Sequence, residues 1–339
     1  MNNNLTKVGI LGGSGFTGEE LLKILSNHPK TEVIAVSSRE LQGQSTNEIL
    51  EGSDLMFVDP SDDIFFECDA IFFATPHGVS MNMVSSFLNK NIKVIDLSAD
   101  FRLKNVDVWK EWYGSPHLQE ELLSESVYGL TELNKEKIKS ARLIAVPGCY
   151  PTASLLGVLP LLNKGAQIES IIIDAKSGIS GAGRKTVENG LSLEINENFK
   201  AYGIQGHRHL PEIAEIVELV SGYPISINFL PHLIPAMRGI YSTIYVQLKD
   251  LENLDIQNLY DSFYMDSPNV RIMNSEEVPD IKSIAKTNNC NISVNKSNIE
   301  NQVIVISSID NLVKGAAGQA VECYNLMYGF NQSTGLDNG

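Results

Sequence analysis

The chain has 339 residues, a length that predicts about two domains of ordinary size. Its 26 lysines and arginines are outnumbered by 41 aspartates and glutamates, and the formal net charge of −15 argues against nucleic acid or an anionic membrane as the main partner. Because 43% of the residues are hydrophobic and 20% are charged, the chain can build a large core, which excludes disorder over most of its length.

The four cysteines, Cys68, Cys149, Cys290 and Cys323, have no CxxC spacing. This is typical of a protein from a reducing compartment and argues against a zinc site. The first residues lack a long apolar segment, and no apolar run reaches the roughly 18 residues that a membrane span needs. We therefore expect a soluble cytoplasmic protein with no bound metal ion.

The first half of the chain alternates between strand-like and helix-like segments. Short apolar or β-branched runs predict strands, and the segments between them with spaced apolar residues predict helices. The predicted strands are 7–12, 32–38, 69–76, 92–100 and 142–148, and the predicted helices are 15–29 and 78–90. Apolar strands separated by helices indicate a parallel sheet covered on both faces. We therefore assign residues 1–148 to an α/β, Rossmann-type dinucleotide-binding domain.

The second half has fewer helices between its strands. The predicted strands are 169–178, 225–233, 239–248 and 301–310, and the predicted helices are 152–165, 256–266 and 313–330. This pattern favours a mixed or antiparallel sheet with helices on one face, and hence an α+β catalytic and oligomerisation domain over residues 149–312. We expect the polar residues 331–339 to form a flexible tail.

A glycine-rich loop joins the first predicted strand to the first predicted helix. Its candidate cofactor-binding residues are Gly12, Gly13, Ser14, Gly15, Phe16, Thr17 and Gly18. Glycines spaced in this way allow a tight turn and a close approach of the backbone to a diphosphate, which then faces the positive end of the helix dipole. The alternative is a glycine turn that serves only helix packing. No Lys-Ser/Thr pair follows the loop, which argues against a P-loop nucleotidase.

The end of the second predicted strand indicates which dinucleotide the loop holds. An NAD enzyme commonly has an acidic residue there for the ribose 2′-hydroxyl, whereas this strand ends in two serines, the second being Ser38, followed by Arg39. Hydroxyls and a cation suit a 2′-phosphate, so we predict NADP(H), with an ordinary solvated arginine as the alternative for Arg39. Thr75, Pro76 and His77 follow a buried strand and are further candidates to line the cofactor groove.

Cys149 lies where the last strand of the first half meets a predicted helix. Pro151 suits the first turn of that helix, because its missing N–H costs nothing there. Cys149 is then next to the positive helix N-terminus, which favours the thiolate that a cysteine nucleophile needs. Backbone N–H groups at the same end are suited to stabilise an oxyanion. The other three cysteines are interpreted as small buried residues.

Two of the six histidines flank an arginine in a glycine-bounded segment, His207-Arg208-His209. In an extended segment both histidines would point to one side and Arg208 to the other. A thiolate nucleophile needs an acid/base group, which a histidine provides near neutral pH. Zinc binding is the competing interpretation, but no third ligand is close in the sequence.

Two loops have the composition of an anion site. One, residues 98–102, lies at the end of the buried strand 92–100. The other, residues 176–184, is rich in glycine with a cation at each end. The alternative for each is an ordinary surface loop. The candidate substrate-binding residues are Ser98, Arg102, Lys176, Arg184, Arg208 and Glu212, and Ser177 and Gly178 are candidates for the cofactor.

Motifs spread over nearly the whole chain form one set. They are GGSGFTGEELL, ATPHG, LSADFR, VYGLTEL, VPGCYPT, KSGISGAGR, GHRHLPEI and DNLVKGAAGQA. This set resembles the N-acetyl-γ-glutamyl-phosphate reductases of arginine biosynthesis, which belong to the same group as the aspartate-semialdehyde dehydrogenases. The GCYPT and HRHLPE motifs are specific, whereas the glycine loop is common to many dehydrogenases.

The resemblance implies an NADPH-dependent reduction of N-acetyl-γ-glutamyl phosphate to N-acetylglutamate semialdehyde and phosphate. In such enzymes the cysteine, here Cys149, attacks the acyl carbon, phosphate leaves, and hydride reduces the thioester. The acid/base group is then His207 or His209, of which we favour His209. The resemblance further implies that helix 313–330 returns to the nucleotide domain, with Asn311 and Gly315 near the nicotinamide, and that the protein is a homodimer or homotetramer.

Two alternative functions stay open at this point. A related enzyme would act on aspartyl phosphate or on a carrier-linked aminoadipyl phosphate, and only the motif match separates these substrates. A non-catalytic NADP-binding regulator would have the same fold, but the presence of Cys149 and of the histidine pair argues against it.

Overall fold

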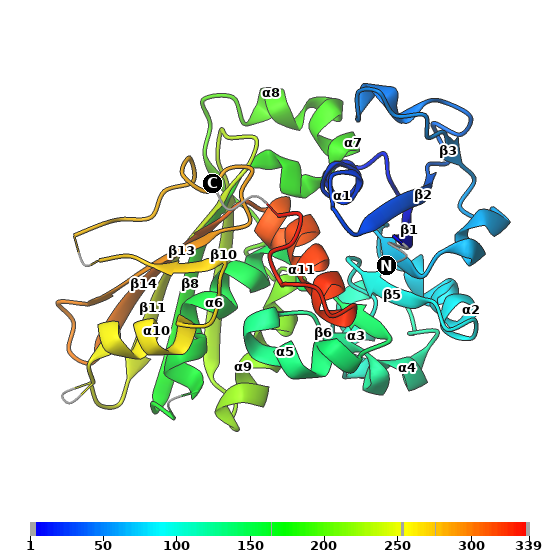
Figure 1. The fold of residues 1–339 in the computed structure, drawn as a ribbon. Coiled ribbons are helices and arrows are strands. Elements are labelled where there is room, and N and C mark those ends of the chain that lie inside the picture. The colour runs from blue at the N-terminus through cyan, green and yellow to red at the C-terminus, as the bar shows by residue number, and fades with distance from the viewer. Residues whose placement is uncertain (1–4, 164, 252–253, 275, 337–339) are drawn as a thin grey trace. The chain divides into compact units, whose positions relative to one another are not determined.

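The computed structural model describes residues 5–163, 165–251, 254–274 and 276–336 (Figure 1). The described residues form two compact units, which we describe separately: residues 5–147 with 316–336 are the first, and residues 148–315 are the second. The predicted fold class is confirmed, because the first unit contains a parallel sheet and the second a mixed sheet.

The first unit is built on a seven-stranded sheet with the order β3-β2-β1-β4-β5-β7-β6, in which every described pair is parallel. The strands are β1 (Thr6–Leu11), β2 (Thr31–Ser37), β3 (Phe57–Val58), β4 (Ala70–Phe73), β5 (Lys93–Asp96), β6 (Val127–Tyr128) and β7 (Leu143–Ala145). β1 lies between β2 and β4, so the strand order reverses beside it. Ligands of open α/β sheets bind at such a switch point, and the loop after β1 starts there.

Helices cover both faces of this sheet. Phe72 belongs to one hydrophobic cluster, whereas its neighbours Ile71 and Phe73 belong to a second, as the alternation of side chains along a strand requires. The first cluster includes residues of α1, α5 and α11, and the second includes residues of α2, α3 and α4. The helices are α1 (Phe16–Ser26), α2 (Val84–Leu88), α3 (Val106–Tyr113), α4 (Glu120–Glu125), α5 (Thr131–Ser140) and α11 (Gly318–Met327), with short 3₁₀ turns η1 (Thr46–Glu48), η2 (Asp63–Glu67) and η3 (Ser80–Asn82).

The second unit contains a seven-stranded mixed sheet with the order β12-β13-β14-β11-β8-β10-β9. β10 pairs with β8, and β12 with β13, in parallel, and the other described pairs are antiparallel. The strands are β8 (Ile168–Ser177), β9 (Lys200–Ala201), β10 (Ser226–Leu233), β11 (Ile240–Leu248), β12 (Val270–Ile272), β13 (Cys290–Lys296) and β14 (Gln302–Ile309).

One face of the mixed sheet packs against α6, the long helix of this unit. A Cβ atom added to Gly157 of α6 would lie 2.6 Å from the side chain of Ile244 of β11, so this side chain packs directly on the helix backbone there. The helices and turns are α6 (Cys149–Asn163), η4 (Ile179–Ala182), α7 (Arg184–Thr186), η5 (Val187–Leu191), α8 (Ser192–Glu194), α9 (His209–Ser221), α10 (Ile256–Tyr264) and η6 (Val313–Ala317).

Two sequence predictions need correction. Residues 78–90 form the turn η3 and the short helix α2 rather than one helix. By contrast, the predicted helix 313–330 starts where expected, as a π-helical turn over residues 313–317 that leads directly into α11. The tail prediction is wrong for residues 331–336, because the Gln332 side chain is buried and donates to Glu322 at 2.6 Å. Residues 337–339 lie outside the described part of the chain.

A helix that crosses a bilayer needs about 20 predominantly apolar residues. In the part of the chain that the structure describes, no helix is both long enough and apolar enough to span a membrane.

Candidate active site

A cavity of about 320 Å³ opens in the second unit at the start of α6. It brings together the predicted nucleophile and both predicted acid/base histidines, which are far apart in the sequence. The lining residues are Cys149, Tyr150, Ser177, Gly178, Gly181, Ala182, Thr186, Leu191, Lys200, Tyr202, His207, His209 and Leu233.

Cys149 is the first residue of α6 and is partly exposed, whereas the other three cysteines are buried. Pro151 falls in the first helical turn, as the sequence predicts. The backbone on either side of the cysteine is tightly placed. Gly148 donates its N–H to the Glu212 carboxylate at 2.8 Å, and a Cβ atom on Gly315 would lie 2.9 Å from the Cys149 Cβ. Because Gly315 has no side chain, there is space for the Cys149 side chain beside it.

Glu212 has a different environment from the one expected of a substrate-binding residue. Its side chain is buried in α9, with 2% exposure, and it accepts the Gly148 N–H. A buried carboxylate needs such donors, because burial without them is costly. The contact fixes the backbone one residue before Cys149.

The histidine pair lies in the cavity, but not in an extended segment. α9 begins at His209, and Arg208 already has helical backbone angles, so the proposed alternation of side chains is wrong. The two rings still meet, with centroids 4.8 Å apart, and the His207 Nδ1 accepts the His209 N–H at 3.1 Å. Burial, and then the Arg208 charge, lower the pKa of His207 to about 4, so this imidazole is neutral at neutral pH.

Two tyrosines that the sequence analysis did not select also line the cavity. The Tyr202 hydroxyl donates to the Tyr150 hydroxyl at 3.1 Å, and Tyr150 donates to the His232 carbonyl at 3.3 Å. Both rings meet the His207 ring edge-on. Burial raises the pKa of Tyr202 to about 12 and that of Tyr150 further, so both hydroxyls stay protonated and can donate hydrogen bonds.

The cation in the cavity is not one of those predicted. Of the described lining residues, Lys200 of β9 is the only lysine or arginine, and its ammonium pairs with Glu194 of α8. The predicted cations lie elsewhere in the unit: Lys176 pairs with Asp174 at 2.6 Å, and Arg184 pairs with Glu188 at 3.4 Å.

Some of the other predicted residues of the second unit line the cavity, and others lie outside it. Ser177 and Gly178 line the cavity, and Ser177 donates to the Gly178 carbonyl at 2.9 Å. Arg208 is exposed beside the start of α9. Asn311 is buried, and both ends of its amide are bonded within its own unit, to Gly239 and Ser180.

The glycine loop of the first unit has the geometry of a backbone cradle. Gly12 has φ +88°, and its N–H donates to the Ser37 hydroxyl at 3.2 Å. A Cβ on Gly13 would lie 2.2 Å from Val36, and one on Gly18 would lie 2.2 Å from the Gly12 carbonyl oxygen. By contrast, a Cβ on Gly15 would meet nothing closer than 3.8 Å. The loop is therefore closed toward the protein and open at Gly15, which is the shape that a bound diphosphate requires.

The remaining cofactor candidates surround this loop or the end of β4. Phe16 and Thr17 form the first turn of α1, and the Ser14 and Ser38 hydroxyls are 2.9 Å apart. Arg39 is exposed, and its charge helps to lower the pKa of Asp59, after the larger effect of Ser61. Thr75 and Pro76 follow β4, and the next residue, His77, packs its ring 5.3 Å from that of Tyr113.

Ser98 and Arg102 are structural in their observed contacts. The Arg102 guanidinium is buried and donates to the carbonyls of Val146 and Leu97 at 2.8 and 2.7 Å, and its role in binding the substrate stays a prediction. Ser98 donates to the Asp96 carboxylate at 2.8 Å. Burial and the neighbouring Asp100 raise the pKa of Asp96 to about 7.

Comparison with known families agrees with this architecture. Residues 7–141 match the family model described as semialdehyde dehydrogenase, NAD binding domain, and residues 149–311 match the one described as semialdehyde dehydrogenase, dimerisation domain. Among solved structures, an aspartate semialdehyde dehydrogenase II from Vibrio cholerae has a TM-score of 0.76 at 16% identity, covering 96% of this chain and 98% of its own. The one from Candida albicans, solved with NADP, has a TM-score of 0.68 at 14% identity, covering 96% of this chain and 98% of its own. The fold and the cavity thus define a semialdehyde dehydrogenase architecture.

Curated relatives are much more similar in sequence. A protein of Nitrosospira multiformis named N-acetyl-gamma-glutamyl-phosphate reductase is 45% identical over 337 residues, and one of Nitrosomonas eutropha with the same name is 47% identical over 339, each alignment covering 98% of both chains. The chain therefore belongs to the N-acetyl-gamma-glutamyl-phosphate reductases, a family of the semialdehyde dehydrogenase group.

Proposed function

We propose that this chain reduces N-acetyl-γ-glutamyl phosphate to N-acetyl-L-glutamate 5-semialdehyde, with release of phosphate, as a step of arginine biosynthesis. The observation that carries the proposal is the cavity in which Cys149, at the first position of α6, lies with His207 and His209. The two relatives with 45% and 47% identity support this choice of substrate.

The first chemical step is attack of the Cys149 thiolate on the acyl carbon. A bond forms between Sγ and that carbon, the bond from carbon to the phosphate oxygen breaks, and phosphate leaves with the electron pair. The helix N-terminus favours the thiolate and, through its N–H groups, the oxyanion that forms during attack. The product of this step is a thioester on Cys149.

The histidine pair supplies the proton transfer that the cysteine needs. A neutral imidazole accepts the thiol proton before attack. The low pKa of His207 keeps that ring neutral at neutral pH but also makes it a weak proton acceptor. We keep the sequence-based preference for His209 as the acid/base group. His207 stays the alternative, because both rings line the cavity.

Lys200 and the tyrosine hydroxyls are proposed to hold the anionic substrate. Lys200 offers a positive charge within the cavity, and its partner Glu194 lies on a short helix outside the main sheet. Tyr150 and Tyr202 stay protonated, and each would exchange its present acceptor, the His232 carbonyl or the Tyr150 hydroxyl, for a phosphate or carboxylate oxygen of the substrate.

The loop of Gly12–Gly18 fits the diphosphate of NADP(H), because its backbone is open at Gly15 and closed elsewhere. When bound, NADPH supplies the hydride that reduces the thioester. We propose that Ser38 and Arg39 hold the 2′-phosphate, since no acidic residue stands at the end of β2. The preference is measured as the ratio of kcat/KM for NADPH and NADH, and Arg39→Ser should lower that ratio about tenfold.

We propose that two copies of the chain associate through the sheet face opposite α6. Ile172, Tyr245 and Ile304 are direct neighbours across three strands on this face, and Ile172 is 46% exposed. The match to a dimerisation domain supports this proposal. The mass measured by light scattering after size exclusion should be at least that of a dimer, and Ile172→Glu should lower it.

The experiment for the reaction is NADPH oxidation with enzymatically generated N-acetyl-γ-glutamyl phosphate. Aspartyl phosphate and a carrier-linked aminoadipyl phosphate serve as the comparison substrates, at matched concentrations. The highest kcat/KM with the N-acetylglutamyl substrate supports the proposal. A higher value with either comparison substrate overturns the assignment of substrate, and no oxidation with any of them overturns the assignment of reaction.

A further inference from the structure

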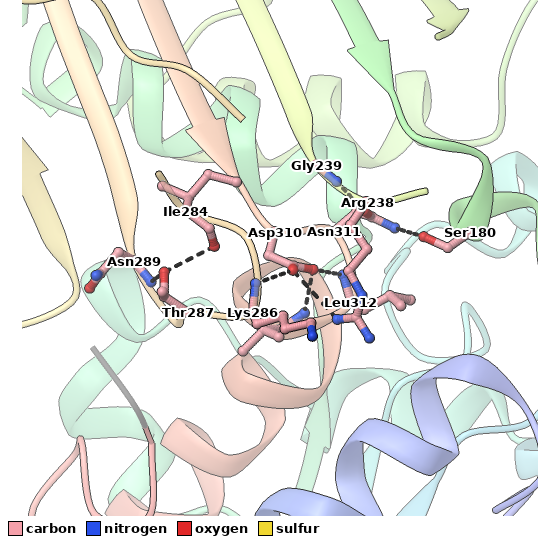
Figure 2. Close-up of polar contacts among 11 residues, drawn as sticks. Ser180, Arg238, Gly239, Ile284, Lys286, Thr287, Asn289, Asp310, Asn311 and Leu312 are labelled. Carbon is pink, nitrogen blue, oxygen red and sulfur yellow. Dashed lines mark hydrogen bonds and ion pairs between the residues drawn. The ribbon is translucent and has the colours of Figure 1, made fainter. Parts of the chain in front are cut away.

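Two adjacent polar residues of the second unit, Asp310 and Asn311, are joined to loops on several sides (Figure 2). They follow the end of β14, and their side chains are 0% and 2% exposed. We call Asp310 and Asn311 the 310 pair. Neither side chain lines the cavity, yet each is bonded to backbone or side-chain atoms of other loops.

The Asp310 carboxylate accepts hydrogen bonds from backbone on two sides. One oxygen accepts the N–H groups of Leu312 and Val313 at 2.8 and 3.2 Å, and the other accepts the Lys286 N–H at 2.7 Å. Arg238 approaches the second oxygen at 3.5 Å. These donors satisfy a fully buried carboxylate, which would otherwise be costly to bury.

The Asp310 contacts define the path of the chain toward the nucleophile. The turn that they close continues to Gly315, whose N–H donates to the Asp310 carbonyl at 2.9 Å. Gly315 is also the residue that lies against Cys149, where an added Cβ would come within 2.9 Å of the Cys149 Cβ. The carboxylate of Asp310 thus shapes one boundary of the space around the nucleophile.

Asn311 fixes a second boundary, the loop at the end of β8. Its Oδ1 accepts the Gly239 N–H at 2.7 Å, and its Nδ2 donates to the Ser180 hydroxyl at 2.8 Å. Ser180 lies between Gly178 and Gly181, which line the cavity. Since the Gly178 N–H also donates to the Gly239 carbonyl at 2.8 Å, the Asn311 amide joins both sides of this loop pair.

We propose that the 310 pair consists of positioning residues for the Cys149 reaction. Asp310 places the 312–315 turn against the cysteine, and Asn311 places the 178–181 loop, so together they set the space between the nucleophile and the cavity wall. This inference rests on the proposed function only in taking Cys149 as the reacting group. Misplacement of a reacting group by about 1 Å is enough to cost about 100-fold in rate.

The test compares Asn311→Ala, Asp310→Asn and Ser180→Ala with a matched control, Asn325→Ala. Asn325 is also a fully buried asparagine, with amide bonds to His28, Gln332 and Thr334, but it belongs to the first unit. Three quantities are measured for each variant: Tm, the rate of Cys149 alkylation by iodoacetamide between pH 6 and 9, and kcat with KM for the acyl phosphate.

Asn311→Ala and Asp310→Asn should lower kcat about 10- to 100-fold and change the alkylation rate or its pH midpoint. Ser180→Ala, which removes one hydrogen bond, should do the same more weakly and keeps the test available if the other variants do not fold. Asn325→Ala should lower Tm without changing alkylation. Loss of Tm with unchanged alkylation and kcat in the 310-pair variants would overturn the proposal. Alkylation requires no substrate, so it tests the 310 pair even if the proposed reaction fails.

Discussion

The glycine loop of the first unit and the cavity of the second present different kinds of chemical groups to a ligand. The loop offers backbone, and its defining feature is the absence of side chains at Gly13 and Gly18, where a Cβ would clash at 2.2 Å. The cavity offers side chains: a thiol, two imidazoles, two phenols and an ammonium group. A backbone site therefore depends on glycines, which have no side chain to block it, whereas a side-chain site depends on residues that the fold brings together from distant parts of the sequence.

The largest loss of activity is expected in the cavity, on substitution of Cys149. Cys149→Ala should lower kcat/KM of the reductase by at least about 10⁴-fold, because no other group can form the thioester. The variant should retain NADPH binding, measured by fluorescence titration, since the cysteine belongs to the side-chain site. Activity within tenfold of the unmodified protein would show that Cys149 is not the nucleophile.

Cys290→Ala is the matched control for this change, because Cys290 is buried in the sheet of the same unit. It should leave kcat nearly unchanged. Alkylation near neutral pH should also select Cys149, since burial and the nearby Asp69 raise the pKa of Cys68 to about 12 and all three other cysteines are buried.

The histidine pair should give the next largest effect. Replacing the true acid/base residue by glutamine should lower kcat about 10²- to 10⁴-fold, and replacing the other histidine should cost less. We expect the larger loss for His209→Gln. A larger loss for His207→Gln would reverse the assignment.

The pH profile of kcat/KM gives an independent reading of the pair. The pKa of His207 is lowered to about 4, so this ring, as a base, is neutral and active above that pH and loses activity as the pH falls through about 4. If His207 is the base, the rate should change little on that account between pH 7 and 5. A fall near pH 6.5, the ordinary value for histidine, would instead point away from His207.

The backbone site should respond to a single methyl group. Gly18→Ala places a Cβ against the Gly12 carbonyl oxygen, and overpacking of about 1–3 kcal/mol should lower Tm and raise the KM for NADPH about 10- to 100-fold. Gly15→Ala is the matched comparison, because its Cβ meets no protein atom closer than 3.8 Å. It should keep Tm but still weaken NADPH binding. Equal Tm and equal KM in both variants would contradict the cradle.

The smallest effect should come from Lys200. Lys200→Met should raise the KM for the acyl phosphate about 3- to 10-fold, a modest change because the Lys200 side chain is 39% exposed and solvent screens its charge. The effect should shrink at high salt. Lys185→Met, in the neighbouring exposed segment, should leave KM unchanged, and a similar KM for both variants would remove Lys200 from the substrate site.

The sequence predicts the strands well wherever burial makes them apolar. The core strands β1, β2, β4, β8, β10, β11 and β14 are recognisable as apolar runs. β13 was missed because CNISVNK carries polar residues, although Ser293 is fully buried in the sheet. α9 was missed because its first residues, His209 to Glu212, suggested a catalytic loop, and a proline within the first turn does not prevent a helix.

In the candidate site, too, residues marked by local sequence signals were predictable, whereas those placed by the tertiary fold were not. Cys149 and the histidines were predictable, because a cysteine at a helix start and two clustered histidines are local signals. Lys200 was not, since only the pairing of β9 with β10 brings this lone lysine to the cavity. The surroundings of Arg102 were not predictable for the same reason: its buried carbonyl partners, Val146 and Leu97, are set by the tertiary fold.

The contact of Gly315 with Cys149 also bears on how the chain is assembled. Gly148 begins the second unit and Gly315 ends it, and the chain between them leaves and returns at nearly one point, beside the nucleophile. Residues 148–315 therefore have the topology of an insertion. The chain leaves the nucleotide-binding unit after residue 147 and re-enters it at residue 316. Such a module can be exchanged or lost during evolution without moving the ends it connects, which gives one dinucleotide fold a simple route to new chemistry.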